Sequence, residues 1–267
     1  MEQGGYIHGY SERERSRLAD QASALEAILH GGTAYPPESR VLEAGCGVGA
    51  QTVPLARRSP GAAIVSVDVD RGSLAEARER TAREGMQPVT FLQGDICRLP
   101  FPDASFDHVF VCFVLEHLAD PERALRELRR VLAPGGSITA IEGDHGSALY
   151  FPPGNAARNN IGCLISLQAQ AGGDACIGRR LYPLLVRAGF SGVSVSPRPV
   201  YADHSRPELV AGFTRATFIA MVAAVKDRAL AAGRPPAAWE QGMAELERTA
   251  GPEGTFLYTF FRAVGRK

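Results

Sequence analysis

Residues 41–50 read VLEAGCGVGA, and this stretch predicts the fold of the chain. An apolar, strand-like start leads directly into Gly45, Gly47 and Gly49. This pattern suits a strand that turns tightly into a helix and leaves bare backbone free to approach a ligand. The same glycines also fit the fingerprint of dinucleotide-binding folds, or an ordinary loop. Glu43 discriminates between the possible ligands. A fixed carboxylate beside the loop would repel the pyrophosphate of a dinucleotide and attract an ammonium or sulfonium group.

A second carboxylate follows the next strand-like run. Residues 63–68 read AIVSVD and end in Asp68, roughly 20 residues past the glycine loop. At the tip of a neighbouring parallel strand, such a carboxylate can accept both hydroxyls of an adenosine ribose. The competing interpretation is an N-cap for the helix that follows. S-adenosyl-L-methionine (SAM) fits both carboxylates, because it carries an ammonium, a sulfonium and an adenosine.

Strand and helix patterns alternate further along the chain. Strand patterns recur within residues 89–96, where a turn bearing Asp95 follows the strand, and at 106–114 and 138–142. A helix pattern lies at 121–128, and a sharp turn lies at 132–137. The alternation predicts a parallel, doubly wound sheet, whose ligands bind outside the carboxyl ends of the strands. Glu43, Asp68, Asp95 and Phe113 would all lie at that edge. There Asp95 could accept from an adenine amine while Ile96 packs on the ring.

Residues from about 40 to 145 resemble a class I SAM-dependent methyltransferase, of the group that includes the ubiquinone and menaquinone biosynthesis methyltransferases. The matching stretches are VLEAGCGVG (41–49), SVD (66–68), GDI (94–96), LPF with SFD (99–101 and 105–107) and LAPGG (132–136). The resemblance implies an α/β fold: a Rossmann-like, doubly wound, seven-stranded sheet, mostly parallel with an antiparallel last strand, here with a helical lid. It says almost nothing about the substrate.

The resemblance also implies roles for the matched residues. The backbone of Gly45, Gly47 and Gly49 would line the methionine and ribose parts of SAM. The implied side-chain contacts are Glu43 with the methionyl ammonium, Asp68 with the ribose hydroxyls, Asp95 and Ile96 with the adenine, Phe113 near the sulfonium, and Gln51 with the methionine carboxylate. Val69, directly after Asp68, belongs to the same expected cofactor site.

Composition restricts the possible partners. The 267 residues carry 29 basic and 29 acidic side chains, so the formal net charge is zero, which argues against a broad footprint for nucleic acid or an anionic membrane. We see no apolar run of membrane-spanning length and no signal peptide. The five cysteines (46, 97, 112, 163 and 176) are odd in number and lack metal-ligand spacing, so we expect free thiols in a cytoplasmic protein without a metal.

The chain divides into four segments. We expect residues 1–38 to form an amino-terminal helical arm, 39–206 the SAM-binding Rossmann-like core, 207–253 a helical insertion, and 254–267 the last core strand. The insertion separates strand patterns at 193–196 and 256–261 and is too long for a simple hairpin. Together with the arm, it would form a lid over the substrate. The oligomeric state leaves no signal in the sequence.

The candidates for proton transfer are Glu142, Asp144 and His145, expected in a turn directly after the fifth strand. Methyl transfer needs a general base only when the nucleophile must lose a proton at or before transfer. His145 could accept that proton near neutral pH, with a neighbouring carboxylate orienting its ring. The alternative is a polar turn whose carboxylates bind backbone amides.

Further aromatic residues are candidates for the substrate site. Tyr6 and Tyr10 lie in the amino-terminal arm, which could fold across the pocket and shield the sulfonium, and Tyr201 could form part of the pocket wall. The alternatives are a disordered terminus and ordinary packing. The fourth strand ends in apolar residues instead of the polar signature of nucleobase amino-methyltransferases. This apolar wall favours a small aromatic molecule over nucleic acid.

These observations predict a methyltransferase that acts on a small, aromatic molecule. The arm and the segment around Glu142 are also similar to bacterial enzymes that methylate carbon 3 of indoles in tryptophan-derived natural products, so an indole carbon is a specific candidate. O- or N-methylation of another small metabolite is an alternative. Two alternatives come from other functional classes: a non-catalytic SAM-binding protein and a nicotinamide-dependent oxidoreductase.

Overall fold

The computed structural model describes residues 25–86 and 88–267, and its centre is a seven-stranded sheet in the order β3-β2-β1-β4-β5-β7-β6. The strands are β1 (Arg40–Ala44), β2 (Ala63–Asp68), β3 (Thr90–Gln93), β4 (Phe106–Cys112), β5 (Leu132–Phe151), β6 (Ser191–Ala202) and β7 (Thr255–Arg266). The pairs from β3 to β5 are parallel, and β7 runs antiparallel to both β5 and β6. The prediction of a doubly wound, mostly parallel sheet with an antiparallel last strand is confirmed.

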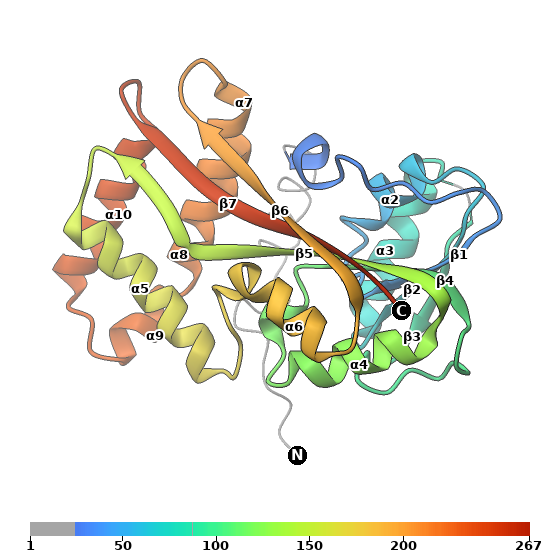
Figure 1. Cartoon of the computed structure of the whole chain (residues 1–267). Coiled ribbons are helices and arrows are strands. Elements are labelled where there is room, and N and C mark those ends of the chain that lie inside the picture. The colour runs from blue at the N-terminus through green and yellow to red at the C-terminus, as the bar shows by residue number, and fades with distance from the viewer. Residues whose placement is uncertain (1–24, 87) are drawn as a thin grey trace.

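Helices cover both faces of this sheet (Figure 1). The helical residues 25–29, α2 (Thr52–Arg58) and α3 (Arg71–Arg83) lie on one face, and α4 (Pro121–Val131) and α6 (Leu181–Arg187) lie on the other. Because β1 and β4 are covered twice, their residues are almost continuously buried, as is usual for parallel strands. The expected fold topology therefore follows from short apolar strands that alternate with amphipathic helices.

The last three strands of the sheet extend well beyond its parallel part. Leu149 of β5 pairs with Leu257 of β7, which in turn pairs with Tyr201 of β6. We call this three-stranded part, residues 144–151, 197–202 and 255–260, the extension. A helical cap covers one of its faces (Figure 1). The cap consists of α5 (Asn155–Gln170), α7 (Pro207–Leu209), the π-helix η3 (Val210–Ile219), α8 (Ala220–Ala224), α9 (Lys226–Ala231) and α10 (Pro236–Thr249).

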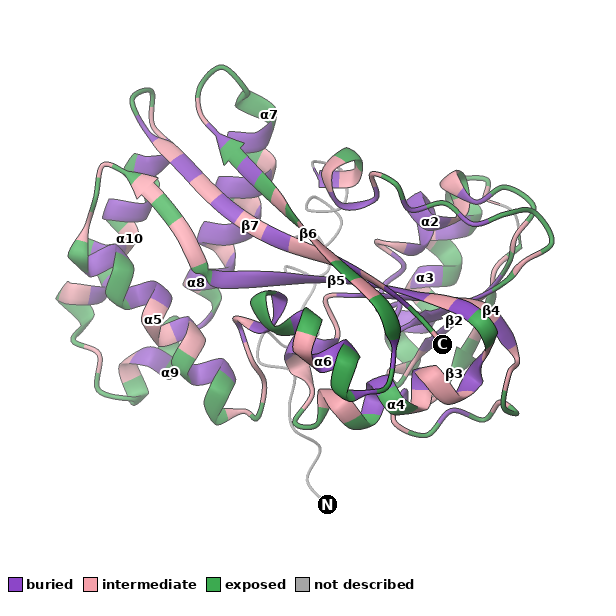
Figure 2. Cartoon of the chain, in the orientation of Figure 1, coloured by how far each residue is buried: buried purple, intermediate pink, exposed green. Residues whose placement is uncertain are grey.

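Burial alternates along the extension (Figure 2). Phe256, Tyr258 and Phe260 of β7 are buried and face the cap, whereas the residues between them are partly exposed on the outer face. The inner residues belong to one continuous apolar cluster that also contains Leu29, the β4 residue Phe110 and the α10 residue Trp239. The helical insertion is thus packed into the core of the protein, while its function as a lid stays a prediction.

One expectation about local structure is wrong, and one helix was not predicted. The predicted turn at residues 142–145 does not exist, because β5 continues through it to Phe151. The strand continues because β7 runs on beside it, pairing Gly143 with Phe260 and Asp144 with Thr259. The helix α5, which contributes much of the cap, was not predicted. The predicted arm at residues 1–38 lies outside the described residues up to position 24.

The run Pro207–Ala231 is apolar and long enough, by length and composition, to cross a membrane. However, 56% of its most apolar window is buried inside the fold. The side chains of Phe213, Phe218 and Val222 belong to the shared apolar cluster, so the run packs as a core helix in this structure.

Candidate active site

The glycine loop lies between β1 and α2, and all three glycines have positive φ angles of 77°, 50° and 76°. A side chain at Gly45 would lie 2.5 Å from Val114, and one at Gly49 would lie 2.9 Å from the backbone of Ala77 in α3. A side chain at Gly47 would meet nothing within 4 Å. Gly45 and Gly49 therefore allow close packing inside the protein, and Gly47 leaves bare backbone facing open space, where a ligand can approach.

Asp68 ends β2 directly beside this loop. Its carboxylate accepts hydrogen bonds from the peptide N–H groups of Gly47, at 2.8 Å, and Asp70, at 2.9 Å. Asp70, and not Asp68, caps α3, since it accepts from the N–H of Ser73 at 2.6 Å. The helix N-cap expected near residues 68–73 is therefore Asp70, and Asp68 has other partners. Burial raises the pKa of Asp68. The neighbouring Val69 is 55% exposed, so this strand end is open to solvent on one side.

Glu43 lies beneath the loop instead of on its rim. Its side chain is only 2% exposed, and Oε2 accepts hydrogen bonds from the hydroxyls of Ser66, at 2.6 Å, and Thr52, at 2.7 Å. The carboxylate therefore ties β1 to β2 and to the start of α2. Burial raises the pKa of Glu43 to about 7. A cationic ligand would oppose this shift, because it would stabilise the ionised form.

Three other predicted cofactor residues are held by protein partners. Asp95 Oδ1 accepts from the N–H of Cys97 at 2.8 Å, which forms a local turn after β3. Ile96 is 6% exposed and belongs to the apolar cluster on the α4 side of the sheet. The side-chain oxygen of Gln51 lies 2.7 Å from Nε2 of the buried His30. Their predicted contacts with SAM stay predictions.

Phe113 follows β4 at the same edge in a conformation that is rare for a large side chain. Its φ angle is 58°, in the left-handed region. Such backbone strain concentrates at functional sites. The ring lies 5.4 Å from that of Phe260, and the contacts continue through Tyr258 and the cap residues Phe213 and Phe218. An aromatic cluster therefore leads from the ligand edge of the sheet into the cap.

The three candidates for proton transfer are not brought together. Because residues of a strand alternate between faces, Glu142 and Asp144 point to one side and His145 to the other. Glu142 Oε1 accepts hydrogen bonds from two backbone N–H groups. Asp144 forms a bidentate ion pair with Arg179, with N···O distances of 2.6 and 2.7 Å. The expectation that a neighbouring carboxylate orients His145 is wrong. Tyr258 does so instead, with its hydroxyl 2.8 Å from His145 Nδ1.

The predicted aromatic contacts differ in their placement. Tyr6 and Tyr10 lie outside the described residues. Tyr201 lies in β6 between the cap-facing residues Val200 and Ala202, so its 42% exposed side chain points to the outer face of the extension. It therefore faces away from His145 and the aromatic cluster. Tyr258 was missed, although the alternation at residues 256–261 could have placed it on the inner face.

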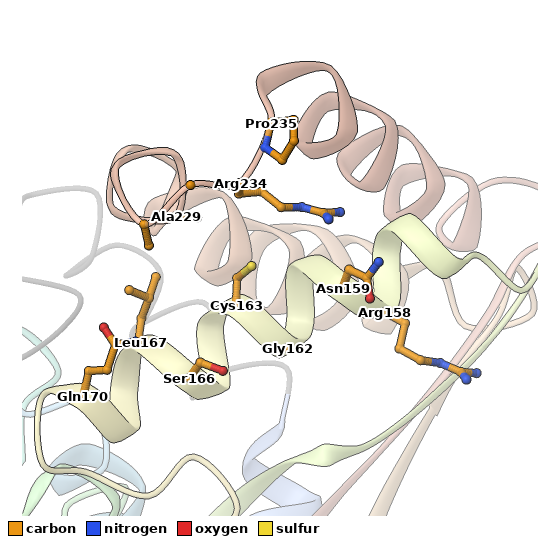
Figure 3. Close-up of a pocket in the computed structure, with 12 residues that line it drawn as sticks. Arg158, Asn159, Gly162, Cys163, Ser166, Leu167, Gln170, Ala229, Arg234 and Pro235 are labelled. Carbon is orange, nitrogen blue, oxygen red and sulfur yellow. The ribbon is translucent and has the colours of Figure 1, made fainter.

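A separate groove of about 670 Å³ lies among the helices of the cap (Figure 3). It lies between α5 and the turn from α9 to α10, and is lined by Cys163, Ser166 and Arg234 among others. None of the predicted site residues lines this groove. The candidate active site is therefore the strand edge around Gly47, Asp68 and Phe113, together with the aromatic cluster.

Comparison with known proteins identifies the domain that carries this edge. Residues 42–140 match the family model described as a methyltransferase domain. The demethylmenaquinone methyltransferase of Thermus thermophilus is 41% identical over 114 residues, which cover 43% of this chain and 48% of that enzyme. The chain contains a class I SAM-dependent methyltransferase domain.

Two longer proteins are similar to this chain beyond its methyltransferase domain. An uncharacterised 37.1 kDa protein in a transposon of Streptomyces fradiae is 32% identical over 248 residues, which cover 92% of this chain and 66% of that protein. The phosphoethanolamine N-methyltransferase 2 of Haemonchus contortus shares the fold, with a TM-score of 0.60 at 18% identity, over 100% of this chain and 61% of that one. The chain thus spans about half to two thirds of the length of these relatives.

Proposed function

We propose that this protein transfers a methyl group from SAM to a small, aromatic or largely apolar molecule. The observation that carries the proposal is the continuity between two features: the strand edge of the methyltransferase domain, where Gly47 and Asp68 adjoin, and the aromatic cluster that starts at Phe113. The rings behind Phe113 are buried, while Phe113 itself is partly exposed at the strand edge, so an aromatic acceptor could pack against this end of the cluster. The specific candidate for the acceptor is an indole carbon in a tryptophan-derived natural product, and we propose that the reaction takes place in the cytoplasm. The alternative is O- or N-methylation of another small metabolite.

The residues at the edge fit an adenosyl cation in chemical terms. Gly47 presents bare backbone to open space, Asp68 supplies carboxylate oxygens that ribose hydroxyls can reach, and Val69 supplies an exposed apolar wall. Glu43 lies directly behind the loop and contributes a carboxyl group whose charge a cation would favour. When bound, SAM supplies a methyl carbon that its positive sulfur has already activated. The protein then has to align the acceptor atom about 3 Å from that carbon and exclude water.

His145 is the proposed proton acceptor of the reaction. It is 5% exposed, contacts Phe218 edge-on, and is oriented by the Tyr258 hydroxyl. If carbon 3 of an indole is the nucleophile, the ring nitrogen must afterwards lose its proton, and an imidazole facing the aromatic cluster can take it. Asp144 is not the proton acceptor in this proposal. Both of its carboxylate oxygens bind Arg179, and its side chain points to the other side of β5.

Replacement of His145 tests this assignment. We expect His145→Ala to lower turnover by roughly 10²- to 10⁴-fold, while the affinity for S-adenosylhomocysteine barely changes. Asp144→Ala serves as the matched variant on the opposite face and should act through protein stability. Unaltered turnover in His145→Ala would show that no proton acceptor is needed there, and would leave alignment of the acceptor as the means of catalysis.

Ligand binding tests the proposed function as a whole. Calorimetry should show micromolar binding of S-adenosylhomocysteine and none of NADH, and the reverse would favour a nicotinamide-dependent oxidoreductase. A panel of indoles, phenols and quinols incubated with labelled SAM should then reveal the acceptor class. Tight cofactor binding with transfer to none of them would favour a non-catalytic SAM-binding protein.

A further inference from the structure

The turn between β4 and the short helix η1 (Leu115–His117) is held by β5 through three consecutive peptide groups. The N–H of Phe113 donates to the carbonyl of Ile141 at 2.9 Å. The next two N–H groups, of Val114 and Leu115, both donate to Oε1 of Glu142, at 3.0 and 2.8 Å. A single carboxyl oxygen therefore satisfies two buried backbone donors that no strand partner reaches.

This turn connects the two parts of the proposed site. On one side, the Val114 side chain lies so close to Gly45 that a β-carbon there would be 2.5 Å from it, so Val114 packs on the glycine loop. On the other side, Phe113 begins the aromatic cluster from a left-handed backbone conformation with φ of 58°. A large residue keeps such a conformation only where its surroundings impose it. The hydrogen bonds to Ile141 and Glu142 fix the two peptide groups on either side of the Phe113 α-carbon.

The state of the Glu142 carboxyl argues against proton transfer. The side chain is fully buried, and Oε2 has no hydrogen-bond partner among the described residues. Burial and the nearby carboxylate of Glu116 raise the pKa of Glu142 well above its usual value. Oε1 is already engaged by two donors of the turn. Because the side chain is also fully buried, the carboxyl group has no open route to a proton of the substrate.

We propose that Glu142 is a positioning residue, which accepts the hydrogen bonds that hold the β4–η1 turn and thereby places Phe113 and the glycine loop for SAM. This role rests on the proposed function and deepens it. It replaces the base role that the sequence predicts for Glu142 by an indirect one, in which the side chain meets neither substrate nor the reacting atoms.

Two substitutions separate positioning from proton transfer. Glu142→Gln keeps a side-chain carbonyl oxygen and no charge, so we expect S-adenosylhomocysteine affinity and kcat within about threefold of the parent protein. Glu142→Leu fills similar space but leaves two buried N–H groups without an acceptor, so we expect about 10- to 100-fold weaker cofactor binding and a higher KM for SAM.

Glu245→Leu is the matched control for loss of a buried carboxylate that accepts backbone N–H groups. Glu245 binds the N–H of Ala157 at 2.8 Å, in the cap, and its replacement should lower stability without lowering cofactor affinity. If Glu142→Gln loses more than about 100-fold in kcat while it binds the cofactor normally, Glu142 transfers a proton and the proposal is overturned. Unchanged affinity in Glu142→Leu would overturn it as well.

Amide hydrogen exchange keeps this inference distinguishable from the proposed function. The N–H groups of Val114 and Leu115 should stay protected in Glu142→Gln and lose protection in Glu142→Leu, whether or not the protein methylates anything. If Glu142→Leu does not fold, Glu142→Gln still decides the matter, since protection and turnover must both survive in it. Loss of protection at these two amides in Glu142→Gln would refute the proposal.

Discussion

The acidic residues of the candidate site mainly bind the protein itself. Glu43 accepts two hydroxyl hydrogen bonds, Asp68 accepts two backbone N–H groups, and Glu142 accepts two more. Buried polar groups need partners whether or not a ligand is bound, so a carboxylate near a binding edge is first a structural group. The residue types of the site were predictable from the motifs. Their partners were not, because Ser66, Thr52 and Val114 carry no distinguishing pattern.

Replacement of Glu43 should remove one pH dependence of stability. The pKa of Glu43 is raised to about 7 from 4.5, so the folded state holds its proton more tightly than the unfolded state does. The contribution of this group to stability is therefore fully present below pH 4.5 and is lost as the pH rises through 7. Glu43→Gln stays neutral and should gain on the parent protein by on the order of 3 kcal/mol between pH 5 and 8. Urea unfolding at several pH values measures this, and parallel curves would contradict it.

At the scale of elements, the strands and helices of the methyltransferase domain were predictable because their signals are local. Residues 106–114 form an apolar run and 121–128 an amphipathic pattern that starts at a proline, and both segments fold as expected. The helix α5 was missed, because no side chain of its own caps its start at Gly154. Its cap comes from Glu245 in α10, 88 residues away from Ala157. The prediction of a turn at residues 142–145 was wrong for the same reason. The strand β5 continues there because it pairs with β7, which lies more than 100 residues later in the sequence.

Glu245 should be a distant N-cap of α5. The backbone N–H groups that it accepts lower its pKa, so its contribution to stability is present above its unfolded pKa and is lost as the pH falls. We expect Glu245→Ala to destabilise the protein by about 0.5–2 kcal/mol at neutral pH, and by less in acid. Chemical denaturation at neutral and acidic pH tests this. An equal loss at both would show that packing, and not the charged cap, carries the effect.

At the scale of the whole molecule, the cap and the methyltransferase domain share one hydrophobic core. The apolar cluster runs from Leu29 in the helical residues 25–29 and Phe110 in β4 to Trp239 and Leu246 in α10 without a break. The sequence segments 39–206 and 207–253 suggest separate units, but their cores are joined by the extension. Which small molecule the aromatic cluster accepts could not be predicted, because its shape depends on residues from β4, β7 and the helical insertion.

A shared core predicts cooperative unfolding. Trp239 is the single tryptophan of the chain, is 1% exposed and lies in the cap, so its fluorescence reports the cap alone. Far-ultraviolet circular dichroism reports all helices and strands. We expect the two signals to change at the same urea concentration. Loss of the Trp239 signal at clearly lower urea would mean that the cap opens while the sheet remains folded.

The two-residue repeat of β5 makes this segment intolerant of changes in length. Removal of one residue from the strand before position 142 would move every following side chain to the opposite face of the sheet. Asp144 would then occupy the place of Gly143, where the Tyr258 hydroxyl leaves no room for even a β-carbon, and the imidazole would turn toward Arg179. Point substitutions here alter one group at a time, whereas a single deletion would exchange the chemistry of the two faces, so natural variants of this strand should differ in residue identity while they conserve its length.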